Sequence, residues 1–592
     1  MIFGKRINKY YLKYAPLFII GIVVLAVIDF AQLQIPKIYR ILLTALNTGY
    51  ADAEKTIEFS LDVLLNDICF PMLLIVLALL FGRFLWRVCF FGASVNTEEG
   101  LRREMFDHAK DLSQSFYSEN KVGSLMSLFT NDLSTIEECF GWGVMMFFDA
   151  LLLGVMSLYN MFTLQPVLAV LCLLPMALLA IVGSILNKYM MKKWDLREEA
   201  FSRISDFSQE SFSGIAVIKA YVKEAKELWV FKKLNSENEK ANVDFTKMSV
   251  ALRVSVTFFV QSVICIILGF GGYLVYNKTV TAEALLEFVG YFTAIIWPIM
   301  AISELIDMSS RGKASLNRIT SLLEAKIEVK DADNAVDAGV LNGKIEFKNL
   351  SFKYSENART ILDDLSFEIN AGETVGIIGK IGAGKSTIVD LITKTYNVGN
   401  DKILLDGKDI NGLTLKSIRR NIAYVPQDNF LFSETIADNI AFSSDEKDMD
   451  KIKKYASLAC VSGDIESFPE GYDTVLGERG VTVSGGQKQR ISIARALMKE
   501  APILILDDSV SAVDTQTEKT LLENIFKTRK GKTTLIIAHR ISTVERADRI
   551  LFLERGKKLA FGTHEELLST CPEYAKLVEL QKLEEREENA DV

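Results

Sequence analysis

The stretch ETVGIIGKIGAGKST, residues 373–387, decides the fold of the C-terminal half of the chain. It begins with a short apolar run, which is typical of a central parallel strand covered on both faces. The run leads into the pattern G-x-x-x-x-G-K-[ST], whose glycines let backbone N–H groups curl around phosphates. A helix that follows directly points its positive end at the same anion. The order of strand, loop and helix therefore predicts a phosphate-binding loop.

Two side chains of this loop have distinct expected roles. Lys385 reaches the terminal phosphates of a nucleotide, and the Ser386 hydroxyl ligates Mg²⁺. The residues expected to hold the nucleotide are Gly379, Lys380, Gly382, Ala383, Gly384, Lys385, Ser386 and Thr387.

Strand-like segments also occur at 344–354, 503–507 and 533–539. Helical patterns alternate with them, which favours an α/β nucleotide-binding fold. Asp507 ends the strand ILILD and suits a second Mg²⁺ contact, direct or through water. Tyr354, at the end of the first strand, is expected to stack on the adenine, an interaction worth about 1–3 kcal/mol.

A second anion-binding surface is predicted in VSGGQKQRISIARAL, residues 483–497. A serine and two glycines open an amphipathic helix, whose N-terminus offers backbone donors to an anion. This surface and the phosphate-binding loop need not bind the same nucleotide.

The N-terminal half is predicted to cross a membrane six times. The chain has 592 residues, too many for one ordinary domain, and 49% of them are hydrophobic. A span needs about 20 mostly apolar residues, and the segments that qualify are 15–36, 68–92, 138–162, 165–187, 250–276 and 284–308. We therefore expect an all-α transmembrane domain of six helices at 1–322, a linker at 323–342, an α/β P-loop domain at 343–580 and an acidic tail at 581–592.

Charge and cysteine content narrow the function further. The net charge is −8 and no basic tract stands out, so we expect no nucleic-acid partner. The seven cysteines lack C-x-x-C spacing and are interpreted as reduced packing residues. With three histidines, a histidine-rich metal site is not expected.

Two long connections, 93–137 and 188–249, have a helical pattern and are rich in Arg and Lys. The bias of positive charge toward the cytoplasm places both connections, both termini and the nucleotide-binding domain in the cytoplasm. We expect helices near 115–130 and 208–223 to contact that domain and pass its motion into the membrane. The alternative is that these helical hairpins merely pack together.

Ionisable residues inside membrane spans carry a free-energy cost in lipid, so each is expected to have a structural or functional role. Two interpretations stay equally open: a polar lining of a cargo cavity, or snorkelling and pairing between helices. The candidates for the cavity are Asp29, Arg83, Asp149 and Glu304.

The combination of motifs resembles the ATP-binding cassette of ABC transporters, and the membrane half is similar to that of ABC exporters. The residues that carry the resemblance are Tyr354, GKIGAGKST, Gln427 in YVPQDNF, LGERG at 476–480, VSGGQ, ILILDD, SAVD ending at Asp514, and His539 in IIAHR.

The resemblance implies a dimer in which two cassettes close head-to-tail over two ATP molecules with Mg²⁺. Gln427 then senses the Mg²⁺ bound by Ser386 and Asp507, and links it to the membrane domain, while His539 contacts the γ-phosphate. Asp514 communicates across the dimer, and the ATP of the other chain is contacted by Ser484, Gly485, Gly486 and Gln487.

One position departs from the family pattern, because Asp508 stands where the family has a glutamate as general base. Loss of a methylene withdraws the carboxylate by about 1.5 Å, and a misplacement of about 1 Å can cost on the order of 10²-fold in rate. We therefore predict that the site of this chain binds ATP well and hydrolyses it slowly. This pattern resembles one chain of heterodimeric bacterial exporters, and a heterodimer is favoured over a homodimer with a slow aspartate base.

The expected function is ATP-driven export of a hydrophobic or amphipathic small molecule, drug or lipid across the plasma or inner membrane. Within transport, a peptide exporter or an importer of chelated metals (siderophores) with the exporter fold are alternatives. An ATP-gated regulator or channel is an alternative of another class, against which the intact VSGGQ and His539 argue.

Overall fold

The computed structural model describes residues 4–51, 57–355, 358–444, 446–477, 480, 483–510 and 514–590. Two motifs noted above fall partly outside this range: Glu478 and Arg479 of LGERG, and residues 511–513 of SAVD. The chain divides into two compact units. The first contains residues 1–110 and 122–324, and the second contains residues 111–121 and 325–592.

The first unit is all-helical, as expected, and the described residues contain six helices long and apolar enough to cross a membrane. They are longer than the spans predicted from hydropathy, because their polar ends continue beyond the apolar core. Their bounds, with those of the short helices of the unit, are α1 Lys5–Lys13, α2 Ala15–Thr48, α3 Leu61–Val63, a π-helical turn Leu64–Cys69, α4 Phe70–Ala109, α6 Val122–Ser127, a π-helical turn Leu128–Asp132, α7 Leu133–Glu138, a π-helical turn Cys139–Gly143, α8 Val144–Leu164, α9 Pro166–Ser213, α10 Ile215–Ala220, α11 Glu224–Tyr276 and α12 Ala282–Leu323.

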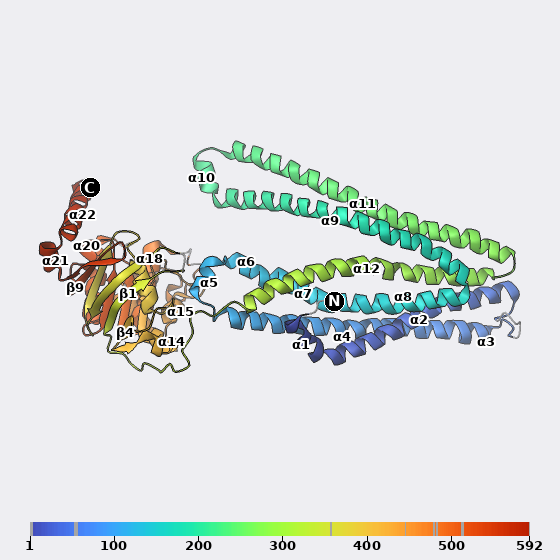
Figure 1. Cartoon of the computed structure of the whole chain (residues 1–592), viewed down its shortest axis with the longest axis horizontal. Coiled ribbons are helices and arrows are strands. Elements are labelled where there is room, and N and C mark those ends of the chain that lie inside the picture. Colours follow the sequence, from blue (N-terminus) through green and yellow to red (C-terminus); the bar gives the residue numbers. More distant parts are fainter. Residues whose placement is uncertain are drawn as a thin grey trace. The chain divides into compact units, whose positions relative to one another are not determined.

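Helices α9 and α11 run side by side as a long hairpin, with the short α10 at its tip (Figure 1). Gly214 ends α9 and begins α10, so the chain reverses there, within the range where a short helix was expected. Three apolar side chains at this tip are largely exposed: Phe212, Val217 and Tyr221. Helices α2, α4, α8 and α12 form the remainder of the bundle.

The second unit is an α/β domain with two sheets. The larger sheet has the order β10-β9-β3-β8-β7-β6, and its strands from β9 to β6 are parallel. The smaller sheet is antiparallel, with the order β2-β1-β4-β5. The strand bounds are β1 Ile345–Phe352, β2 Leu362–Ile369, β3 Thr374–Gly379, β4 Ile403–Leu405, β5 Lys408–Asp409, β6 Ile422–Val425, β7 Ile503–Asp507, β8 Thr533–Ile537, β9 Arg549–Glu554 and β10 Lys557–Gly562.

The helices of this unit are mostly short. They are α5 Gln114–Glu119, α13 Lys385–Ile392, α14 Leu415–Arg420, α15 Ile436–Ala441, α16 Met449–Leu458, α17 Ser462–Glu466, α18 Gly485–Met498, α19 Thr515–Thr528, α20 Ile541–Val544, α21 His564–Thr570 and α22 Pro572–Ala590. Helix α22 begins before the segment expected as an acidic tail and runs into it.

The apolar central strands are buried on both faces because each contributes to two cores. Along β7, Ile503 and Ile505 face a core shared with the smaller sheet and α13, whereas Leu504 and Leu506 face a core shared with α15, α16 and α18. This explains why the run ILIL shows no polar alternation. The predicted strands at 373–379, 503–507 and 533–539 are confirmed as β3, β7 and β8.

The segment 111–121 belongs to the same compact unit as the nucleotide-binding domain. Ser113 donates a hydrogen bond to the carboxylate of Glu328 at 3.3 Å, and Ser115 donates to the same oxygen. The backbone oxygen of Glu328 accepts a hydrogen bond from Asn397 at 2.6 Å, so this residue joins the segment to the loop after α13.

A buried guanidinium ties three chain segments together at the base of the larger sheet. Arg529 is 7% exposed and donates to the carbonyl oxygens of Ala501, Pro502 (2.9 Å) and Thr533 (2.8 Å). Burial lowers its pKa to about 10, so the group stays charged at neutral pH.

We expect Arg529→Met to destabilise the nucleotide-binding domain by about 2–4 kcal/mol, because it leaves buried carbonyl oxygens without donors. Thermal unfolding of the purified chain in detergent checks this as a fall of several degrees in the midpoint. Lys530→Met removes an exposed neighbouring cation and is expected to leave the midpoint unchanged. Equal midpoints for the two variants would contradict the prediction.

Candidate functional site

The phosphate-binding loop follows β3 and requires glycine at defined positions. Gly382 and Gly384 have φ angles of +80° and +94°, in the left-handed region that favours glycine. At Gly384 a Cβ would also lie 2.7 Å from the side chain of Leu362, and at Gly379 it would lie 2.3 Å from the carbonyl oxygen of Leu553. These contacts explain the glycine pattern that identifies the loop in the sequence.

Lys385 lies at the centre of the loop and is 7% exposed. Its ammonium donates to the carbonyl oxygen of Gly379 at 2.7 Å, which holds it across the loop. Burial lowers the pKa of Lys385, and the negative charges of Asp508 and Asp507 oppose this shift. An anion that enters the loop therefore meets a desolvated cation, next to the N-terminus of α13.

Asp507 ends β7 with 3% of its surface exposed, and the Ser386 hydroxyl lies within hydrogen-bonding reach of its carboxylate. Burial raises the pKa of Asp507, the hydrogen bond from Ser386 lowers it, and the charge of Asp508 raises it. A divalent cation between Ser386 and Asp507 would offset the burial and the repulsion. These two residues therefore fit Mg²⁺, an ion that binds proteins through few carboxylates and takes its other oxygens from phosphates and water.

The described residues contain no group of three or more His, Cys, Asp and Glu side chains arranged to hold a metal ion. A metal at Ser386 and Asp507 would thus depend on the nucleotide for the rest of its shell.

Asp508 is held in an unusual backbone conformation directly after β7. Its φ is +45°, and its N–H donates to the carbonyl oxygen of Ile537 on β8 at 2.9 Å. Aspartate tolerates the left-handed region better than most residues do. The backbone of Asp508 is therefore attached to β8 directly after β7.

Tyr354 lines the same pocket, and the residue is 43% exposed. Its hydroxyl is 2.9 Å from Thr387 Oγ1 and donates to Asp390 Oδ2 at 3.3 Å. Burial raises the pKa of Tyr354 to about 12 and that of Asp390 to about 6. Tyr396 packs edge-on against the Tyr354 ring at 4.9 Å between centroids. The ring is thus held at the pocket rim with an accessible face.

Gln427 and His539 complete the constellation, since both line the same pocket, whose volume is about 370 Å³. The structure therefore brings Tyr354, the loop from Gly382 to Thr387, Gln427, Asp507, Asp508 and His539 around one cavity. Gly379 and Lys380 lie beside it, and Lys380 pairs with Glu554 at 3.5 Å.

Three lining residues outside the loop 379–387 were not identified from the sequence: Arg359, Ile361 and Ile537. Arg359 follows Tyr354 by five residues, and a cation at that distance from a ring predicted to stack on adenine was an available signal. Ile361 and Ile537 are not distinguishable from ordinary core residues by sequence alone. Ile381 belongs to the predicted loop and is exposed there.

The second anion-binding surface is not part of this pocket. Ser484 caps α18 by accepting from the N–H of Gln487 at 3.3 Å, and Gln487 accepts from the N–H of Ser484 at 3.0 Å. A Cβ at Gly485 would meet no described atom within 4 Å. Among the described residues, nothing therefore covers the start of α18 at Gly485.

Asp514 also lies outside the pocket, and it caps α19 by accepting from the N–H of Thr517 at 2.9 Å. Backbone hydrogen bonding by Thr517 lowers the pKa of Asp514, so it is an anion at neutral pH.

Three of the four cavity candidates cluster in the membrane unit. Trp297 on α12 donates its indole N–H to Asp149 on α8 at 2.6 Å. Asp149 interacts electrostatically with Arg83 on α4 and with Asp29 on α2. Asp29 is 2% exposed, and its Oδ2 has no hydrogen-bond partner among the described residues. The fourth candidate, Glu304, is exposed on α12.

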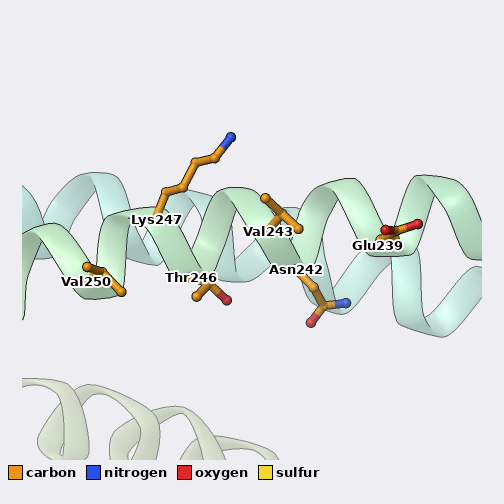
Figure 2. A pocket seen from close by; sticks show the side chains of 6 residues that line it. All are labelled: Glu239, Asn242, Val243, Thr246, Lys247 and Val250. Atoms are coloured by element: carbon orange, nitrogen blue, oxygen red, sulfur yellow. The ribbon is translucent and has the colours of Figure 1, made fainter.

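A further pocket lies on the α9–α11 hairpin, and α11 alone lines it (Figure 2). The lining residues follow the helical spacing of one face, and they are Glu239, Asn242, Val243, Thr246, Lys247 and Val250. The face mixes charges with exposed valines and lacks the convergent donors of the phosphate-binding loop.

Comparison with known proteins agrees with both units. Residues 18–299 match the family model described as the ABC transporter transmembrane region, and residues 362–511 match the family model described as ABC transporter. The chain is 34% identical to the probable multidrug resistance ABC transporter ATP-binding/permease protein YheI of Bacillus subtilis, over 99% of this chain and 98% of the relative. It is also 34% identical to an ATP-dependent lipid A-core flippase of Syntrophus aciditrophicus, over 82% of this chain and 80% of the relative.

Among solved structures, the fold is similar to that of a bacterial Atm1-family ABC exporter with ATP bound. The TM-score is 0.76 and the sequence identity is 25%, over 97% of this chain and 98% of the other. The expected fold class is confirmed, and the pocket around Lys385 lies in the ATPase domain. The chain therefore belongs to the ABC transporter family, as an exporter-type half-transporter that joins one transmembrane region to one ATP-hydrolysing domain.

Proposed function

We propose that this chain exports an amphipathic small molecule or lipid as one half of a heterodimer, and that its own ATP site hydrolyses slowly. The observation that supports slow hydrolysis is the fixed backbone of Asp508. Because its N–H is bonded to Ile537 at 2.9 Å, the main chain cannot advance to compensate for the shorter side chain. A general base must come within about 2.6–3.2 Å of the proton that it takes.

In this proposal the pocket of this chain holds ATP and Mg²⁺. Lys385 and the N–H groups of the loop bind the phosphates, Tyr354 stacks on the adenine, and Ser386 and Asp507 hold the ion. Gln427, which lines the same pocket, would sense the ion and link it to the membrane domain, and His539 would contact the γ-phosphate. The ion supplies charge neutralisation at the phosphates, and the shared pocket supports these roles.

The start of α18 acts on the other nucleotide in this proposal. Ser484, Gly485, Gly486 and Gln487 lie outside the pocket of this chain, yet the capping of α18 by Ser484 leaves N–H groups available at its N-terminus. These groups complete a second, competent site whose Walker residues and glutamate come from the partner, with Asp514 between the two sites.

The exposed surface of the α9–α11 hairpin also favours contact with a second chain. The tip of the hairpin exposes Phe212, Val217 and Tyr221, and its α11 face holds the uncovered pocket of Figure 2. Large exposed apolar side chains at a helical tip favour burial against another surface. A homodimer would also cover them, and Asp508 is what favours two different chains.

For the cargo, the acidic cluster of Asp29 and Asp149 favours a cationic amphipath. Asp29 lies on α2 and Asp149 on α8, and Asp149 accepts from Trp297 on α12 and interacts with Arg83 on α4. Asp149 and Trp297 are partly exposed. Asp29 Oδ2 has no hydrogen-bond partner among the described residues, and a cation near such a carboxylate in an apolar bundle reduces the cost of its burial. The relative named for multidrug resistance and the one named as a lipid flippase both fit an amphipathic cargo.

Measurements of nucleotide binding test the assignment of residues 379–387 as a phosphate-binding loop. We expect Gly384→Ala to weaken ATP binding at least tenfold, because alanine is strained at a φ of +94° and clashes with Leu362. Gly412→Ala is the matched control, since a Cβ there meets no described atom within 4 Å. Binding of a fluorescent ATP analogue to the purified chain is the measurement. Unchanged affinity for Gly384→Ala would overturn the assignment of the loop.

ATP turnover tests the heterodimer, with the chain alone and with its candidate partner chain. We expect the chain alone to be nearly inactive and the pair to be active. Gly485→Ala disturbs nothing within this chain, so a loss of about 10²-fold in the pair would report a contact across the dimer. Asp508→Glu is expected to change the rate of the pair only modestly.

Brisk turnover by the chain alone would instead make Asp508 a working base in a homodimer. Full activity of the Gly485→Ala pair would remove the proposed role of α18.

Transport into inverted vesicles tests the cargo. We expect Asp149→Asn to reduce uptake of the lipophilic cation ethidium about tenfold, with uptake of a neutral lipid analogue and ATP turnover retained. Asp62→Asn, at an exposed acid of α3, serves as the control. An equal loss for the cation and the neutral lipid would show that the acid acts structurally and does not select cations.

A further inference from the structure

The backbone beside His539 is held by a side chain from the C-terminal helix. Gln581 of α22 donates its Nε2–H to the carbonyl oxygen of His539 at 2.8 Å, and its Oε1 accepts from the N–H of Ile541 at 2.8 Å. One amide thus bridges the two peptide groups on either side of Arg540. The orientation of the amide is unambiguous, because a backbone N–H only donates and a carbonyl oxygen only accepts.

This bridge replaces a missing helix cap. Ile541 is the first residue of α20, and the first N–H groups of a helix need acceptors from outside the helix. The N-cap residue usually supplies one through a short polar side chain, but here it is Arg540, whose guanidinium only donates. Gln581 therefore caps α20 from a helix that lies 40 residues further along the chain.

Helix α22 is anchored firmly enough to act as a support. Tyr574 and Val578 are 0% and 3% exposed and lie in the core shared with α16 and α18. Together with Gln581 they fall at positions i, i+4 and i+7, on one face of the helix. The Tyr574 hydroxyl is also 2.8 Å from His564 Nδ1. The face that carries Gln581 is thus fixed against the domain.

The opposite side of the His539 loop is fixed as well. The N–H of Ala538 donates to Ile377 of β3 at 3.2 Å, and Thr543 of α20 donates to the buried Glu518 of α19 at 2.7 Å. His539 therefore stands between a strand attachment and the Gln581 bridge. Its imidazole lines the nucleotide pocket, and a side chain can reach a phosphate reproducibly only if its backbone is held.

We propose that Gln581 is a positioning residue that holds His539 in place for the terminal phosphate of ATP, so that the C-terminal helix α22 takes part in the nucleotide site. This inference rests on the proposed contact of His539 with the γ-phosphate. It assigns a site function to Gln581, the first residue of the segment 581–592 that was predicted only as an acidic tail.

The test compares ATP with ADP at the site of this chain, because only ATP carries the phosphate that His539 would contact. We expect Gln581→Ala to lower ATP affinity about tenfold, as measured with the purified full-length chain, and to leave ADP affinity unchanged. Gln581→Glu keeps the side-chain size and the acceptor for Ile541, but places an oxygen against the His539 carbonyl, so it should lower ATP affinity at least as much. Glu579→Ala, at an exposed position of α22, is the control.

The double variant Gln581→Ala with His539→Ala should be no weaker than His539→Ala alone, because residues that act through one another do not add. Equal losses for ATP and ADP would mean that Gln581 only stabilises the fold, and additive losses would mean that it acts apart from His539. Either result overturns the inference. If His539→Ala itself left ATP affinity unchanged, the proposed role of His539 would fail, separately from the bridge.

Discussion

The nucleotide site depends on the parallel pairing of β3 with β8 and of β8 with β7. Because Ile537 pairs with both Ile377 and Asp507, the carboxyl ends of the three strands meet at one edge of the sheet. The phosphate-binding loop, the two aspartates and His539 leave the sheet at that edge, although more than 150 residues separate the first from the last. The pairing of these strands sets where each polar group leaves the sheet, and the loops that follow set the final positions of the side chains.

Much of this arrangement was predictable because its signals are local. The loop 379–387 combines a glycine pattern with its strand and helix, and the six spans follow from apolar length alone. The antiparallel sheet was not predicted beyond β1. Strands β4 and β5 have three and two residues, too few to show an alternation of apolar and polar residues, and in β2 the adjacent Asp363 and Asp364 interrupt that alternation. Gln581 was missed for another reason. Its role arises from contacts across the fold, and nothing next to it in sequence marks it.

In the membrane unit, too, the sequence predicts the helices but not the contacts between them. Hydropathy identified where the helices cross, but their lengths of 34 to 53 residues include polar continuations that hydropathy cannot bound. Sequence also gave no way to pair the acids of the spans. The structure brings Asp29, Asp149 and Arg83 together and leaves Glu304 apart, so position in a span alone does not define a cluster. The free-energy cost of a charged side chain in lipid indicates which acidic residues need partners. Only the packing of the helices shows which partner each of them has.

Asp508 has a consequence for how the two ATP sites of the proposed dimer would be used. Under the proposed function, the groups expected to bind nucleotide line one pocket, including the loop glycines, Lys385 and Tyr354. The proposed base, Asp508, instead stands on a backbone paired with β8 and has a side chain one methylene shorter than glutamate. Binding and hydrolysis would then depend on different residues and could be lost separately. A site that retained ATP without consuming it would keep the terminal phosphate, and with it the proposed contact to His539 that α22 would support through Gln581. The position of His539 would then serve to hold two subunits closed over ATP, and hydrolysis in the other site would set the rate at which they part.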